Sequence, residues 1–258
     1  MTHKPTDIGR NRTGAATSPI LTKKTVDGAI DSMPQRSFEM AGASKYRVDI
    51  CGRAEPVGTM PPPSSLKGAA ATLMQRLQGK NANVLLDLLG QRLAFERSGV
   101  RLYEALLAKY DAASIHEDGV AREDIEQIRD EELEHFGLLV DALEQLGADP
   151  TVMTPAADVT GVASSGIVKV LADPRTTFTE CLDAILIAEL ADNAAWLMLS
   201  DLAARVGLDE LATRFREALN EEEQHLAKVR HWLGARIDGQ LGVERTTPAP
   251  SPAMPPPG

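Results

Sequence analysis

Four stretches of the sequence carry apolar residues at alternating spacings of three and four, which is the period of an amphipathic α-helix. Near the middle of each stretch, polar residues interrupt the apolar stripe. The pattern predicts four helices that pack together and enclose a polar centre. The stretches are Val84–Tyr110, Arg122–Leu146, Thr177–Val206 and Asp209–Arg236.

Residues that start and stop helices support these limits. Thr177 and Glu180 form a capping-box pattern at the beginning of the third stretch, where each side chain can bond the backbone N–H of the other. Gly147, Gly207 and Gly234 stand where the second, third and fourth helices are expected to end, because glycine readily adopts the left-handed conformation of a helix terminus.

The lengths of the connections predict how the four helices run. Short connections join the first helix to the second and the third to the fourth, so each pair should form an antiparallel hairpin. The link of residues 147–176 is long enough to cross the length of the bundle, and a short helix is expected in it over Gly166–Ala172. The sequence thus predicts an all-α domain over residues 81–237 with helices running up, down, down and up.

The two ends of the chain differ from this central domain in composition. Residues 1–80 contain turn-forming residues throughout and a proline cluster at Met60–Pro63. We expect a mostly extended arm there, with a short helical patch over Ser65–Leu77. Residues 238–258 end in a low-complexity, proline-rich sequence, which predicts a disordered tail.

Charge separates the arm from the rest of the chain. Residues 1–80 carry 12 Lys and Arg against 6 Asp and Glu, whereas residues 81–258 carry 15 against 31. An acidic core repels nucleic acid and attracts metal cations, so nucleic acid is not an expected partner. The basic arm is either simply solvated or in contact with a partner, such as the acidic core of a second subunit in a homo-oligomer.

Membrane and thiol chemistry are not expected from this sequence. It has no run of about 18 apolar residues and no apolar segment of signal-peptide type near its beginning. Cys51 and Cys181 do not belong to a Cys-x-x-Cys pair, so neither a disulfide framework nor a thiolate zinc site is predicted. A soluble, cytoplasmic protein is the expectation.

Two copies of the motif Glu-x-x-His lie in the polar centres of the second and fourth helices. They are Glu132 with His135 and Glu222 with His225. Residues three apart on a helix are separated by about 60° around the axis and about 4.5 Å along it, so a carboxylate and an imidazole can bind one ion. One copy alone would be weak support, because charged residues usually lie on the solvated surface.

The interpretation of the motif as a metal site is stronger because each copy is paired with a glutamate on the preceding helix. Glu96 lies 36 residues before Glu132 in the first helix, and Glu189 lies 33 residues before Glu222 in the third. Packing the two hairpins about one axis would bring four carboxylates and two imidazoles together. Buried carboxylates without cations would be severely destabilising, so the sequence predicts two divalent metal ions at this centre.

On these residues, the segment from Leu85 to Trp232 resembles the ferritin-like superfamily, which includes ferritins, bacterioferritins, rubrerythrins, manganese catalases and carboxylate-bridged di-iron oxygenases. The resemblance implies a ferritin-like four-helix bundle that binds two ions, iron or manganese, with Glu132 and Glu222 bridging them. It does not extend to residues 1–80. The implied remaining ligands are Glu96 and His135 on one ion, and Glu189 and His225 on the other.

Other residues near the predicted centre have two interpretations each. Tyr103 and Trp196 are either apolar core or donors of an electron or hydrogen bond to the centre, with Tyr103 the candidate catalytic residue. Asp192 either orients a ligating histidine or forms a salt bridge elsewhere. Four glutamates point away from the inward stripes and are expected to be solvated, namely Glu131, Glu134, Glu221 and Glu223.

Three functions remain open from the sequence. The favoured hypothesis is an oxidoreductase that oxidises Fe(II) or reduces O₂ or peroxide at a carboxylate-bridged di-iron centre, with a manganese catalase-like enzyme as a variant. The second is iron storage without turnover of another substrate, which requires a hollow multi-subunit shell. The third is a helical interaction module whose metals are structural or lost and whose basic arm recruits a partner.

Overall fold

The computed structural model describes residues 37–58, 82–113 and 119–242, together with the single residues Lys23, Asp27 and Met60. Within this part of the chain all regular structure is α-helical and no strand occurs, which confirms the all-α class. The chain divides into two units, Met1–Pro56 and Val57–Gly258. None of the described helices is long and apolar enough to cross a membrane.

The first unit contains helix α2, Ser37–Arg53. Its described side chains, from residue 42 onward, are exposed to solvent. Arg53 forms an ion pair with Asp49 one turn earlier. The expectation of a mostly extended arm did not include this helix, whereas the patch expected at Ser65–Leu77 lies outside the described residues.

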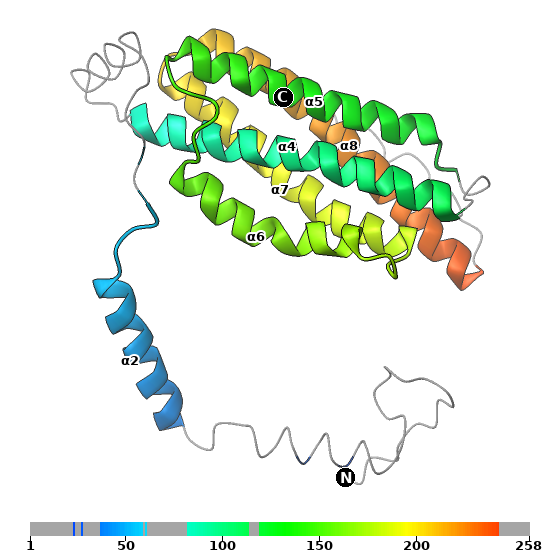
Figure 1. Cartoon of the computed structure of the whole chain (residues 1–258), viewed down its shortest axis with the longest axis horizontal. Helices are drawn as coiled ribbons and strands as arrows, with labels where there is room; N and C mark the ends of the chain where they lie inside the picture. Colours follow the sequence, from blue (N-terminus) through cyan, green and yellow to red (C-terminus); the bar gives the residue numbers. More distant parts are fainter. Residues whose placement is uncertain are drawn as a thin grey trace, which may run out of the picture. The chain divides into compact units, whose positions relative to one another are not determined.

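The described residues of the second unit form five helices (Figure 1). Four of them correspond to the predicted helices, and the fifth, α6, lies in the long connection between the second and the third. Their bounds are α4 Ala82–Ala113, α5 Arg122–Gln145, α6 Pro155–Ala172, α7 Phe178–Arg205 and α8 Asp209–Leu241.

Two apolar clusters fix the directions of the four long helices. One cluster joins the C-terminal halves of α4 and α8 to the N-terminal halves of α5 and α7. The other joins the opposite halves of the same helices. Helices α4 and α8 therefore run one way and α5 and α7 the other, which is the predicted order of up, down, down and up. The polar centre lies between the two clusters.

The helix ends follow local sequence signals in three of four cases. Thr177 and Glu180 form the predicted capping box, and Gly147 and Gly207 have φ values of 75° and 81°, as expected for helix termini. Gly234 is wrong as a terminus, because α8 continues through it. Hydrogen bonds from Arg236 and Gln240 to Thr179 of α7 hold these last turns, and Gly242, with φ 67°, ends the helix.

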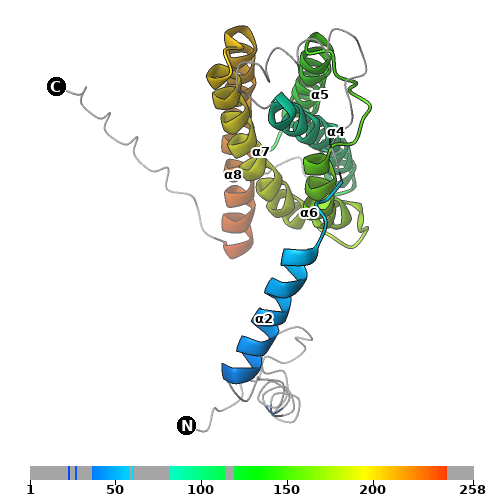
Figure 2. The same cartoon turned by 90° about the vertical axis from the view of Figure 1, so that its left-hand side faces the viewer.

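Helix α6 is longer than the short helix expected over Gly166–Ala172 and packs against α4 and α7 (Figures 1 and 2). Its N-cap Thr154 donates a hydrogen bond to the carbonyl oxygen of Asp87 at 3.1 Å. Gly90 permits this contact, since a Cβ there would lie 2.7 Å from Thr154 Oγ1. At the other end, Lys109 Nζ donates to the carbonyl oxygen of Thr176 at 2.9 Å.

Candidate metal centre

The structure brings all six predicted ligand residues together at the middle of the four long helices. Helices α4 and α7 each contribute one glutamate, and α5 and α8 each contribute a Glu-x-x-His pair. Each of the six is at most 2% exposed, because the apolar clusters close the centre from both ends. The residues are Glu96, Glu132, His135, Glu189, Glu222 and His225.

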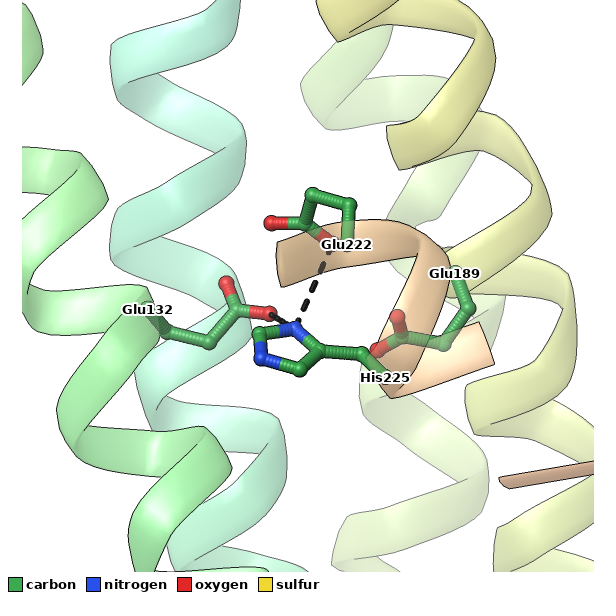
Figure 3. A group of neighbouring side chains, drawn as sticks. All are labelled: Glu132, Glu189, Glu222 and His225. Carbon is green, nitrogen blue, oxygen red and sulfur yellow. Dashed lines mark ion pairs between the residues drawn. The ribbon is translucent and has the colours of Figure 1, made fainter. Parts of the chain in front are cut away.

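The six residues form two overlapping groups that share Glu222. In each group, one ligand atom per residue lies within 4.8 Å of those of the others. The first group surrounds His225, whose Nδ1 is 3.8 Å from Glu132 Oε1 and 3.4 Å from Glu222 Oε2 (Figure 3). Glu222 thus lies between two positions that could each hold an ion. These two groups are Glu132, Glu189, Glu222 and His225, and Glu96, His135 and Glu222; a third group of possible ligands combines Glu96, Glu132 and Glu222 with Asp192.

Each histidine of the centre is oriented by a glutamate from the facing helix. His135 Nε2 lies 2.7 Å from Glu221 Oε2 of α8, and His225 Nε2 lies 2.7 Å from Glu131 Oε2 of α5. A hydrogen bond from Nε2–H to a carboxylate leaves Nδ1 as the nitrogen available to a metal ion. His135 Nδ1 lies 2.8 Å from Glu222 Oε1, so the second nitrogen does face the carboxylates.

Two of the four neighbouring glutamates that were expected to be solvated also contact the histidines. The side chains of Glu131 and Glu221 are 25% and 45% exposed and contact histidines, whereas Glu134 and Glu223 are exposed as expected. The residue before an inward glutamate is turned by about 100° from it around the helix axis. Because α5 and α8 pack against each other, that rotation directs Glu131 and Glu221 toward the facing helix.

Burial and mutual repulsion raise the pKa of most carboxylates in the centre. Burial, followed by repulsion from Glu222, raises the pKa of Glu189 to about 8 and that of Glu132 well above its ordinary value. Glu222 differs: burial favours its protonation, but hydrogen bonds from His135 and His225 outweigh this effect and lower its pKa to about 2. The same contacts outweigh burial at His135 and raise its pKa to about 9. The metal-free centre therefore holds protons where cations would otherwise lie.

The charge of the buried groups matches two divalent ions. Among the described residues, five buried carboxylates, counting Asp192, oppose one buried guanidinium, that of Arg92. With neutral imidazoles this leaves a formal charge of −4, which two divalent cations would neutralise. Glu189 Oε2 is also buried without a hydrogen-bond partner, although buried polar groups normally have one. The residues therefore fit a pair of metal ions.

Gly99 makes room for one of the carboxylates. It lies one turn after Glu96 on α4, and a Cβ at this position would overlap Glu132 Oε2 and lie 2.8 Å from Glu132 Cδ. Any side chain at position 99 would therefore displace the carboxylate of Glu132. Helix α4 thus contributes to the centre through a glycine as well as through a ligand.

Gly99→Ala should weaken metal binding by about 10-fold or more, since it shifts a ligand by displacing its carboxylate. The extra methyl group should also cost about 1–3 kcal/mol of folding free energy. Gly137→Ala in α5 is the matched control, because no atom lies within 4 Å of its added Cβ, and it should gain up to about 1 kcal/mol. Calorimetric titration with Mn(II) and thermal melting measure both effects, and equal affinities in the two variants would contradict this role of Gly99.

The two candidate aromatics contact the centre from different sides. Tyr103 is 1% exposed, and its hydroxyl donates a hydrogen bond to Glu189 Oε1 at 2.5 Å. Burial and the charge of Glu189 raise the pKa of Tyr103 well above its ordinary value, so the hydroxyl keeps its proton. Trp196 packs edge-on against the His135 ring, with 5.4 Å between the ring centroids. Tyr103 is thus placed to hold a ligand carboxylate by hydrogen bonding.

Sequence reasoning missed Arg92, which is 4% exposed. Its Nε lies 2.8 Å from Glu96 Oε1 and its Nη1 lies 2.9 Å from Asp192 Oδ1. Asp192 therefore contacts Arg92, while the two histidines are held by other glutamates. The available signal was the spacing of four residues between Arg92 and Glu96, which places them on one helix face.

No protein-family model, no curated protein and no solved structure matches the chain. The functional conclusion therefore rests on the geometry and charge of the centre.

Proposed function

We propose that the chain is a ferritin-like protein that binds two iron ions and uses them to oxidise Fe(II) or to reduce O₂ or peroxide. The observation that carries this proposal is the buried centre with a formal charge of −4, in which four glutamates and two histidines converge. Such a charge in a bundle interior is costly unless cations neutralise it.

The helix arrangement supports the ferritin-like part of the proposal. Ferritin-like carboxylate proteins take one glutamate from each of two helices and a Glu-x-x-His pair from each of the other two. Here α4 and α7 contribute Glu96 and Glu189, and α5 and α8 contribute the pairs. The directions of the helices and the long connection through α6 also agree with that architecture.

The ligand types favour iron, with manganese as the other candidate. Carboxylate and imidazole ligands suit these ions, whereas thiolates favour softer ones. Of the two cysteines, Cys51 is exposed on α2 and Cys181 is buried in an apolar cluster, so neither belongs to the centre. When bound, a pair of such ions supplies two electrons to O₂ or peroxide.

The residues of the chain have distinct tasks in this proposal. Glu132 and Glu222 would hold both ions, since Glu222 belongs to every group of possible ligands among the described residues and Glu132 to two of the three. Glu131 and Glu221 fix the histidine rings with Nδ1 directed inward. Tyr103 keeps its proton and holds Glu189 by a hydrogen bond, and the two apolar clusters exclude water from either end of the centre.

The metal-free chain should take up two Fe(II) ions anaerobically and then oxidise added Fe(II) under air at least about tenfold faster than buffer does. Elemental analysis gives the stoichiometry, and an oxygen electrode with ferric absorbance gives the rate. Glu132→Ala and His225→Ala should lose both properties. Glu134→Ala is the matched control, because Glu134 is exposed on the same turn of α5.

Two results would contradict the proposal in different ways. Uptake of well under one ion per chain would remove the metal centre altogether. Uptake of two ions without faster consumption of Fe(II), O₂ or peroxide would leave a metal-binding protein and remove the redox function.

A further inference from the structure

A pocket of about 330 Å³ lies between α4, α6 and α7 and reaches the edge of the metal centre. Its walls are mostly apolar and include Ile167, Ile187, Ala191 and Ala195. A second pocket of about 180 Å³ shares Gln91, Arg92, Ala191 and Ala195 with the first. Neither pocket is explained by the proposed oxidation of Fe(II), which needs only small inorganic reactants.

The pocket is graded from a buried charged end to an exposed apolar end. Arg92 and Phe95 are only 4% and 7% exposed, whereas Ile187 on the same pocket is 57% exposed. The guanidinium of Arg92 lies over the Phe95 ring, with 4.3 Å between its Cζ and the ring centroid. The wall between α4 and α6 is fixed by a 2.6 Å hydrogen bond from Gln91 to Thr160.

One hydrogen-bond donor of Arg92 is unpaired. Its Nε and Nη1 face Glu96 and Asp192, but Nη2 is buried without a hydrogen-bond partner. An unpaired buried donor of this kind is costly. A guanidinium that offers one remaining nitrogen, beside apolar walls, suits a carboxylate attached to an apolar group.

The net charge of the buried groups around Arg92 determines whether an anion can bind in the pocket. Without metal, the ion pairs of Arg92 with Glu96 and Asp192 already offset its positive charge. With two divalent ions bound, the formal charge of the buried groups is zero, and the charge of Glu96 is shared with an ion. Metal loading should therefore allow Arg92 to attract an additional anion.

We infer that this pocket binds a small organic monocarboxylate with an apolar tail, whose carboxylate accepts a hydrogen bond from Arg92 Nη2. The tail lies along the apolar walls of α6 and α7 toward Ile187. The ligand carboxylate lies beside the guanidinium of Arg92, next to the metal centre. The inference rests on the proposed function, because the bound ions supply the charge that admits the anion.

The test uses the full chain loaded anaerobically with Mn(II), octanoate as the probe and octanamide as its uncharged analogue. Elemental analysis first confirms two ions per chain, and calorimetric titration then measures binding. Octanoate should bind at least about tenfold more tightly than octanamide, because only the carboxylate forms a charge-assisted hydrogen bond. Octanoate should also bind more weakly to the metal-free chain.

A pocket-filling variant tests the position of the ligand. Ala191→Leu narrows the pocket while leaving the ion pairs of Arg92 intact, which Arg92→Gln would not. It should weaken octanoate binding by about tenfold or more and keep two Mn(II) ions. Ala227→Leu is the matched control, because Ala227 is exposed on α8 and does not line either pocket.

The outcomes separate this inference from the proposed function. Equal affinities for octanoate and octanamide, or equal octanoate affinities in the Ala191→Leu and Ala227→Leu variants, would overturn the inference while two bound Mn(II) ions keep the metal centre. Absence of Mn(II) uptake would overturn the proposed function, and with it the inference.

Discussion

Glu222→Ala should abolish tight binding of both metal ions, lowering each affinity by at least about 100-fold. Glu222 is the one residue that belongs to every group of potential ligands found in the described part of the chain. It also has the lowest carboxylate pKa in the centre, about 2, so it is the ligand that is already ionised at neutral pH. Calorimetric titration with Mn(II) and elemental analysis after gel filtration measure the loss.

Two further variants make this result interpretable. Glu222→Gln keeps the volume of the side chain and removes its charge, so it separates the loss of a ligand from the effect of a cavity. Glu223→Ala removes the next carboxylate along α8, which is exposed, and should keep both ions. Loss of only one ion in Glu222→Ala would assign Glu222 to a single metal, and retention of both would remove it from the centre.

Position along each helix explains why the sequence predicted the six residues of the centre. Each of them lies on an apolar stripe with spacings of three and four, so its inward direction follows from the helical period alone. The order of helix directions followed from the lengths of three connections. Neither inference required knowledge of how the helices rotate against each other.

Features that depend on that rotation were not predictable. Glu131 and Glu221 lie beside the inward stripes, and only the packing of α5 against α8 turns them toward His225 and His135. Gly99 matters because Glu132 occupies the space beside it, which is a property of two helices together. Arg92 likewise acquires its role from Asp192 on α7.

Helix α6 was underestimated for a different physical reason. Between Pro155 and Ala172 the only charged residues are Asp158 and Lys169, so there is little alternation of polar and apolar positions to indicate a helix. Its beginning is fixed by tertiary contacts, since Thr154 both caps the helix and bonds to α4. A helix stabilised from outside its own sequence leaves a weak periodic signal.

Two bound divalent ions should raise the melting temperature of the chain by about 10–20 °C at pH 8. An ion present at about 100 times its dissociation constant stabilises the folded state by about 2.7 kcal/mol. Two ions therefore contribute about 5 kcal/mol, and each kcal/mol corresponds to about 2–4 °C in a domain of this size. Melting of the Mn(II)-loaded and the chelator-treated chain measures the difference.

The metal-free chain should become less stable as the pH rises from 6 to 8. The raised pKa of Glu189, about 8, means that the folded chain retains a proton that the unfolded chain releases near pH 4.5. The raised pKa of His135, about 9, adds stability that is complete below pH 6.5 and is lost as the pH rises through 9. Each retained proton lowers the stability by about 1.4 kcal/mol per pH unit. Glu222 does not contribute to the change of stability between pH 6 and 8, since its pKa of about 2 affects stability only in acid.

Metal binding has the opposite pH dependence, because the ions require ionised carboxylates and neutral Nδ1 atoms. The difference in melting temperature between the loaded and the metal-free chain should therefore widen as the pH rises from 6 to 8. Over this interval the metal-free chain loses stability while the ions bind more tightly. Glu222→Ala should show no metal-dependent difference at any pH. A metal-free melting temperature that rises over this interval would contradict the protonated centre, and a constant difference would show that the bound ions do not displace its protons.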